Sequence, residues 1–158
     1  MKAAISSLKI VPLLFFAFCI NPAKAQSKKT SIETMINSRH FIFKVQTIFP
    51  TGAISRQSIG EYDLKLTGDS LISYLPYFGR AYTAPPPGDQ GYNFVSTKFQ
   101  YSTKTTKKGG WEILIKPNDI RDFREFSLTI SEKGYGTLRA LSNNRQPISY
   151  SGYITAFK

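Results

Sequence analysis

The stretch EYDLKLTGDSLISYL, residues 61–75, decides the fold. Its first half alternates apolar and charged side chains, Gly68-Asp69 then offers a tight turn, and an apolar run returns from Leu71. Alternation interrupted by a short glycine-containing turn predicts an antiparallel β-hairpin. A shift of one residue would expose the leucines and bury the charged side chains, so the register is well specified.

The same two-residue period recurs along most of the chain. It marks residues 41–46, 94–101, 111–116, 126–130, 136–140 and 148–154. About eight strands with little helix predict an all-β fold, either a sandwich or a barrel. A small antiparallel up-and-down β-barrel is favoured, because sequential hairpins suit a meander and closure removes edge strands. Gly136, Ala140 and Gly152, on predicted inward faces, favour the curvature that closure needs.

A short helix is expected before the first strand. Ser31 is suited to cap its first turn, and Ile32, Met35 and Ile36 share one face of a helix that would end near Arg39. Such a helix is expected to lie across the end or flank of the sheet.

Residues 1–25 carry the pattern of a cleavable secretory signal. Two lysines precede an apolar run over residues 10–20, and Ala23-Lys24-Ala25 follows it, which predicts cleavage after Ala25. The apolar run is roughly half the ~20 residues that span a bilayer, so an uncleaved anchor is less favoured. Lipid attachment at Cys19 is a second alternative, disfavoured because the bulky Phe18 precedes it. The protein is therefore expected to be exported, most simply to the periplasm.

The exported part is expected to be one basic domain. Residues 26–30 are polar and predicted as a disordered lead, and residues 31–158 form a single β-barrel domain without a transmembrane span. The signal contains the only cysteine and three lysines, so its removal lowers the formal charge from +11 to +8. This charge favours anionic partners, and export makes glycans, lipopolysaccharide or lipid headgroups better candidates than nucleic acid. The alternative is a dispersed, solvated charge with no partner.

No constellation of residues indicates catalysis. His40 is the only histidine, which excludes cysteine–histidine chemistry and a multi-histidine metal site. Asp119, Asp122 and Glu125 recur every three residues, as in an acid pair or calcium site, but interleaved arginines favour a solvated turn. No catalytic residue, metal or cofactor is predicted, and a hydrolase ranks third among the functions considered.

Aromatic residues near turns are the strongest functional signal. Tyrosine combines a large flat surface with a polar tip, and arginine adds a planar cationic fork. The candidate ligand site at the barrel mouth comprises Tyr77, Arg80, Tyr82, Asn144, Arg145 and Tyr150. The structural alternative is that the aromatic rings fill the interior, while Arg145 ties its turn to a backbone carbonyl or a carboxylate. A further alternative is an envelope protein-interaction module that uses the Pro-rich 84–89 loop and exposed aromatics.

Three segments are distinctive as strings: LPYFGRAY at 75–82, Gly109-Gly110-Trp111, and SNNRQPISY at 142–150. With them the chain resembles domain-of-unknown-function family 4251, an exported family of Bacteroidota, over nearly the whole mature sequence. The resemblance implies a lipocalin-like β-barrel with an N-terminal helix. It implies no activity, and no catalytic residue is carried over.

Overall fold

The computed structural model describes residues 23–83 and 91–157. The signal segment up to residue 22 and the Pro-rich 84–89 loop lie outside them. The elements, in chain order, are α1 (Ala23–Asn37), β1 (His40–Pro50), β2 (Arg56–Gln57), β3 (Asp63–Thr67), β4 (Leu71–Pro76), β5 (Gly91–Ser96), β6 (Phe99–Thr105), β7 (Trp111–Pro117), β8 (Phe123–Ile130), β9 (Tyr135–Ser142) and β10 (Ile148–Thr155). The prediction of an all-β barrel with a short helix is confirmed, with ten strands in place of about eight.

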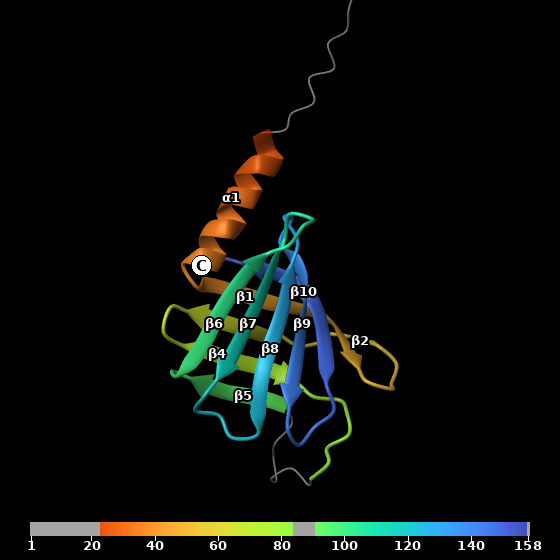
Figure 1. The fold of residues 1–158 in the computed structure, drawn as a ribbon. Coiled ribbons are helices and arrows are strands. Elements are labelled where there is room, and N and C mark those ends of the chain that lie inside the picture. Colours follow the sequence, from red (N-terminus) through yellow and green to blue (C-terminus); the bar gives the residue numbers. More distant parts are fainter. Residues whose placement is uncertain (1–22, 84–90, 158) are drawn as a thin grey trace, which may run out of the picture.

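The strands form one antiparallel meander that nearly closes on itself. Their order is β5-β4-β3-β1-β10-β9-β8-β7-β6, with the short β2 paired to β1. Strands β6 to β10 form the front of the barrel in Figure 1, and β1, β3, β4 and β5 cross behind them. The first and last long strands, β1 and β10, pair side by side and join the two halves.

The predicted hairpin at residues 61–75 is confirmed as β3 and β4. Leu66 pairs with Leu71 and Leu64 with Ser73, and Gly68 takes the left-handed conformation (φ 66°) that glycine adopts without steric cost. Both leucines are fully buried. They belong to one continuous apolar cluster that includes side chains of α1 and of every long strand except β6. The interior is therefore a packed core.

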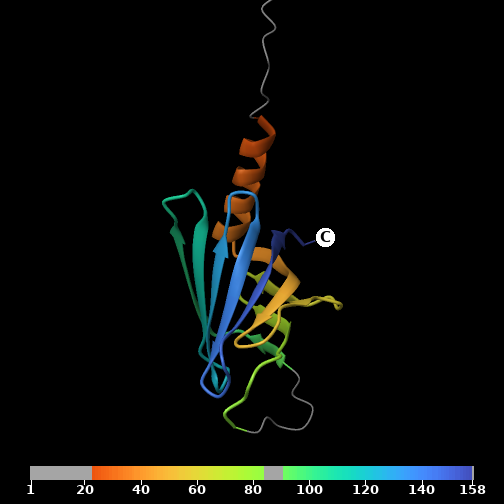
Figure 2. The ribbon, with the colours of Figure 1, turned by 90° about the vertical axis from the view of Figure 1, so that its right-hand side faces the viewer.

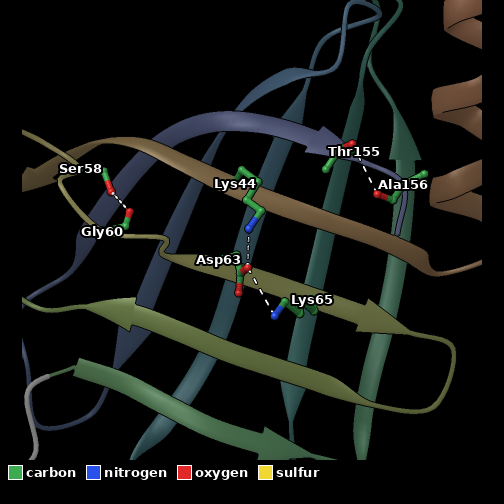
Figure 3. Close-up of polar contacts among 7 residues, drawn as sticks. All are labelled: Lys44, Ser58, Gly60, Asp63, Lys65, Thr155 and Ala156. Carbon is green, nitrogen blue, oxygen red and sulfur yellow. Dashed lines mark hydrogen bonds and ion pairs between the residues drawn. The ribbon is translucent and has the colours of Figure 1, made fainter. Parts of the chain in front are cut away.

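Asp63 is an exception to the expectation that outward-facing charged residues of the strands are exposed to solvent. It lies on the outer face yet is only 4% exposed. Figure 3 shows Lys44 of β1 and Lys65 of β3 pointing toward its carboxylate, with Nζ to Oδ2 distances of 2.9 and 3.5 Å. The two ammonium groups neutralise the carboxylate that they cover, and the Lys44 contact also ties β3 to β1 across their ladder.

The helix is longer than predicted. It begins at Ala23, not at Ser31, and it includes residues 26–30, which were expected to be a disordered lead. Its C-terminal half buries Ile32 and Ile36 against one end of the barrel, as expected from their spacing. Its N-terminal half projects away from the barrel (Figures 1 and 2). Polar residues are tolerated there because the projecting turns have no core to face.

The barrel is open between β5 and β6, which are not hydrogen-bonded to each other. These strands follow one another in the chain, but they are the two ends of the hydrogen-bonded path. Asp119, from the β7–β8 connection, holds the corner where they diverge: its carboxylate accepts hydrogen bonds from the Ser96 hydroxyl and from the amides of Thr97 (3.0 Å) and Lys98 (3.2 Å). Farther along β6, Tyr101 donates a hydrogen bond to the Ile36 carbonyl of α1 at 2.9 Å. Where no backbone hydrogen bonds join β5 to β6, the Asp119 carboxylate holds the corner between them and α1 binds β6 through Tyr101.

Gly152 is expected to be irreplaceable at the junction of β10 and β1. A Cβ there would lie 1.9 Å from the carbonyl oxygen of Lys44, because the two backbones approach closely beside the bulge of β1. Gly152→Ala should lower the free energy of unfolding by about 3 kcal/mol, measured by urea denaturation. The neighbouring Ser151→Ala should change it by less than about 0.5 kcal/mol. Equal effects of the two variants would contradict the close approach.

Asp119 is expected to make stability depend on acid pH. The Ser96 hydroxyl, followed by the backbone amides, holds the pKa of Asp119 below its ordinary value of 3.8. A lowered carboxyl pKa stabilises the folded state above the ordinary value, and this contribution is lost as the pH falls through the folded pKa. Asp119→Asn should therefore melt at a lower temperature than the wild type at neutral pH, and the difference should shrink below pH 3.8. A difference that stays constant with pH would show that the carboxylate charge is not involved.

Candidate functional site

Arg145 is the centre of the barrel mouth, at the end opposite to α1. It lies in the β9–β10 turn and is only 6% exposed. Its Nη1 donates a hydrogen bond of 3.0 Å to the carbonyl oxygen of Gly91, the first residue of β5. Its guanidinium carbon lies 5.1 Å from the centre of the Tyr77 ring and 5.4 Å from that of Tyr92. This contact joins the last hairpin to the β4–β5 side of the mouth by a charged hydrogen bond and two cation–π interactions.

Two tyrosine hydroxyls support this arrangement. The Tyr77 hydroxyl lies 2.7 Å from the carbonyl oxygen of Arg80 and 3.1 Å from that of Gln146. Tyr150 is completely buried, and its hydroxyl donates to the carbonyl oxygen of Pro76 at 2.7 Å. Burial raises the pKa of both tyrosines, so both hydroxyls stay protonated as donors at neutral pH.

The six residues predicted for the site separate into two groups. The structure brings Tyr77, Asn144, Arg145 and Tyr150 to the mouth, where Asn144 and Arg145 line one pocket, but the side chains of Arg80 and Tyr82 are exposed. Their backbone atoms still contribute, because the Gln146 amide donates to the Arg80 carbonyl (3.0 Å) and the Tyr82 amide donates to that of Asn144 (2.7 Å). These bonds hold residues 80–82 beside the β9–β10 turn. The proposed structural role of Arg145, tying its turn to a carbonyl, is present in the structure.

A pocket of about 260 Å³ opens beside Arg145. One wall is aromatic: the Phe123 ring lies 5.1 Å from those of both Tyr92 and Phe94, measured between centres. The other wall is polar, and it is formed by Arg121, Asp122, Ser142, Asn144 and Arg145. The pocket lining thus combines aromatic rings with hydrogen-bonding and cationic groups, a combination typical of small-molecule sites.

The polar wall is shaped by an irregular connection between β7 and β8. Asp122 has a positive φ of 66°, and its carbonyl oxygen accepts hydrogen bonds from the amide of Asn143 (2.9 Å) and the hydroxyl of Ser142 (2.7 Å). The Ser142 oxygen also lies 2.7 Å from the side-chain oxygen of Asn144. This network fixes the β9–β10 turn against the start of β8, where the pocket lies.

Sequence reasoning missed the aromatic wall and Arg121. Arg121 was predicted only as one of the arginines of a solvated turn. The break in alternation at residues 117–125 was the available signal, because an irregular, arginine-containing segment next to a strand end is where loops form sites. Tyr92 is one of the aromatic residues near turns, but nothing in the sequence places it beside Phe123 and Arg121.

The acidic residues of this region do not converge. Asp119 holds the β5–β6 corner, Asp122 lines the pocket, and Glu125 lies 3.5 Å from Lys116 on the neighbouring strand. No group of three potential metal ligands occurs within residues 23–83 and 91–157. His40 packs on Phe157 with ring centres 4.5 Å apart, at the other end of the barrel.

Arg145 is expected to contribute strongly to stability, whereas the nearby exposed Arg80 is not. Arg145→Ala removes a charged hydrogen bond and both ring contacts, and it should lower the free energy of unfolding by about 3 kcal/mol. The matched variant Arg80→Ala, at an exposed side chain, should change it by less than about 0.5 kcal/mol. Chemical denaturation of both variants tests the difference, and a stable Arg145→Ala protein would refute the structural role.

Comparison with known proteins places the chain in a family. The model of the family described as domain of unknown function DUF4251 matches residues 23–154. The crystal structure of a DUF4251 family protein from Bacteroides eggerthii DSM 20697 superposes with a TM-score of 0.61 at 12% sequence identity, over 82% of this chain and 88% of that one. A search of curated proteins gives no match. The resemblance noted in the sequence is thereby confirmed: this chain belongs to the DUF4251 family.

Proposed function

We propose that the protein is an exported, non-catalytic binding protein whose mouth pocket holds a small ligand that has both an acidic group and a flat apolar part. The single observation that carries the proposal is the pocket itself, whose lining brings aromatic rings together with arginine and amide side chains. Recognition would depend on shape and charge, with no bond made or broken.

The aromatic wall supports a flat ligand. The rings of Tyr92, Phe94 and Phe123 form a continuous group, and Phe123 is anchored in turn by Phe126 of the core at 4.4 Å. Tyr92 and Phe123 are only 5% and 7% exposed, so they mainly hold the half-buried Phe94 ring in place, and a ring held in this way loses little conformational freedom when a ligand packs on it. This wall is therefore preorganised for a planar, partly apolar group.

The polar wall supports an acidic ligand. Arg121 and Arg145 outnumber the single carboxylate of Asp122 among the lining residues, so the pocket has a net positive charge. Arg145 is already engaged with Gly91, so the exposed Arg121 is the better candidate for direct contact with a carboxylate or phosphate. The volume of about 260 Å³ is near the lower limit of ligand pockets and restricts the ligand to a single ring or a similar fragment.

The proposal also includes the location of the protein, which we infer to be outside the cytoplasm. The signal pattern of residues 1–25 supports passage to the periplasm, with release or association with the outer membrane as further possibilities. In the part of the chain that the structure describes, no helix is both long and apolar enough to cross a membrane. A small envelope solute or an anionic envelope component is the partner that this location and charge favour.

An envelope protein-interaction module is the second candidate. It is favoured by two isoleucines in the connection from β1 to β3, Ile54 and Ile59, which are 85% and 101% exposed. Tyr82, next to the Pro-rich 84–89 loop, is 67% exposed. Affinity capture of a partner that depends on Ile54, Ile59 or residues 84–89, and not on the pocket, would favour this candidate.

Ligand binding is tested with simple aromatic acids. Benzoate and phenyl phosphate should shift the NMR signals of the pocket residues with dissociation constants of about 1 mM, while uncharged benzyl alcohol should bind more weakly. Arg121→Gln should weaken benzoate binding about tenfold, because it removes a charge-assisted hydrogen bond. The exposed Arg124→Gln, outside the pocket lining, is the matched control and should leave binding unchanged.

Two results would refute the ligand proposal. One is the absence of any shift at the pocket with either acid. The other is native mass spectrometry of protein purified from its own periplasm that shows the sequence mass alone, together with equal effects of Arg121→Gln and Arg124→Gln.

A further inference from the structure

The outer face of strands β8 to β10 is a second feature of interest. These strands lie at the front of the barrel in Figure 1, and no helix or loop of the drawn elements crosses them there. Their outward side chains form cross-strand rows. Thr129, Thr137 and Ser151 make one row, and Ser127, Arg139 and Ser149 make the next. A hydroxyl-rich strip thus surrounds one arginine.

Two exposed tyrosines continue this strip toward α1. Tyr135 of β9 and Tyr153 of β10 are register partners, with ring centres 6.3 Å apart and ring planes at 64°. They are 56% and 38% exposed, so their rings contribute little to the core. Along β9, Tyr135 and Arg139 are separated by four residues, or about 13 Å of strand.

The surface is hollowed on both sides of Tyr135. One hollow, of about 390 Å³, lies between the tyrosine pair and α1 and includes Lys133 and Gln46. The other, of about 520 Å³, lies toward the β6–β7 turn and includes Lys107 and Lys108. Tyr135 is a wall of both hollows, so they adjoin the tyrosine pair on either side. The two hollows and the hydroxyl-rich strip that runs from the tyrosine pair to Arg139 are together called the path.

The charge of this path is positive. Lys133, Arg139, Lys107 and Lys108 are exposed, and none of them is within ion-pair distance of a carboxylate in residues 23–83 and 91–157. Of the two acids that line the path, Glu132 is paired with Lys29 of α1 at 2.5 Å, and Glu112 stands opposite Lys104 in the ladder.

We propose that this path binds an anionic oligosaccharide. The faces of sugar rings carry C–H groups and suit the tyrosine rings, while their hydroxyl edges suit the rows of serine and threonine. Arg139 and Lys133 lie near the two ends of the β9 segment and would bind carboxylate or sulfate groups of the chain. The site is separate from the mouth pocket, which lies at the other end of the barrel.

An anionic saccharide fits this path better than an acyl chain does. Between Tyr135 and Arg139 the outward positions of β9 and β10 hold hydroxyl-bearing side chains and no aliphatic ones. Apolar side chains such as Met35, Ile154 and Ile130 are confined to the two hollows, so the strip between Tyr135 and Arg139 offers an acyl chain no continuous apolar surface.

The test uses galacturonic acid hexasaccharide as the anionic probe and maltohexaose as its neutral counterpart. Isothermal titration calorimetry of the exported chain should show binding of the anionic probe that weakens with added salt, and at least about tenfold weaker binding of the neutral one. NMR shifts should map to β9 and β10. Vesicles of phosphatidylglycerol serve as a lipid probe.

Variants separate the strip from the rest of the surface. The double variant Tyr135→Ala with Tyr153→Ala should weaken binding about tenfold, and Arg139→Gln should weaken it less and flatten the salt dependence. Tyr74→Ala is the matched control, because Tyr74 is 51% exposed on β4 and pairs with Tyr62 at 5.5 Å. It should bind like the wild type, as should Arg121→Gln in the mouth pocket.

Several outcomes would overturn the proposal. They are no binding of the anionic probe by a folded protein, binding that Tyr74→Ala impairs as much as the double variant does, or binding of vesicles without binding of the hexasaccharide. If the double variant unfolds, Arg139→Gln still tests the proposal. Arg139 is exposed and not part of the core, so this variant is expected to fold.

Discussion

The pairing of β1 with β10 is the constraint on which the rest of the structure depends. It joins the first strand of the barrel to its last, so that both halves of the meander contribute to one apolar core. The close approach at Gly152 and the bulge in β1 let the sheet bend there and fold over itself. This junction brings the β9–β10 turn to the β4–β5 side of the mouth, where Arg145 reaches Gly91.

A packed interior places recognition at the ends and on the outer face of the barrel. Buried aromatic and aliphatic side chains fill the space that a wider barrel would leave for a ligand. The mouth pocket uses the rim of this core as its aromatic wall, and the oligosaccharide path uses outward tyrosines that the core does not need. Both proposed sites combine flat rings with cationic groups, consistent with the basic character of the chain.

Much of the fold was predictable, but of the residues that line the mouth pocket only Asn144 and Arg145 were predicted. The hairpin at 61–75 and the inward face of Ile32 and Ile36 followed from local periodicity, which tertiary contacts reinforced. The start of the helix did not, because a polar projecting segment has no periodic face to detect. Among the site residues, Tyr77 and Arg145 were identified from their chemistry, but Arg121 and Tyr92 required knowledge of which loops meet.

The sequence by itself determined the strands, their turns, the curvature at small residues and the basic charge, because each depends on neighbours along the chain. Only the tertiary structure decided that the barrel stays open between β5 and β6, that Asp63 is buried beneath two lysines, and that Arg145 lies between two tyrosine rings. These features join segments far apart in sequence, and their energies depend on distance and burial, which a linear pattern of residues does not specify.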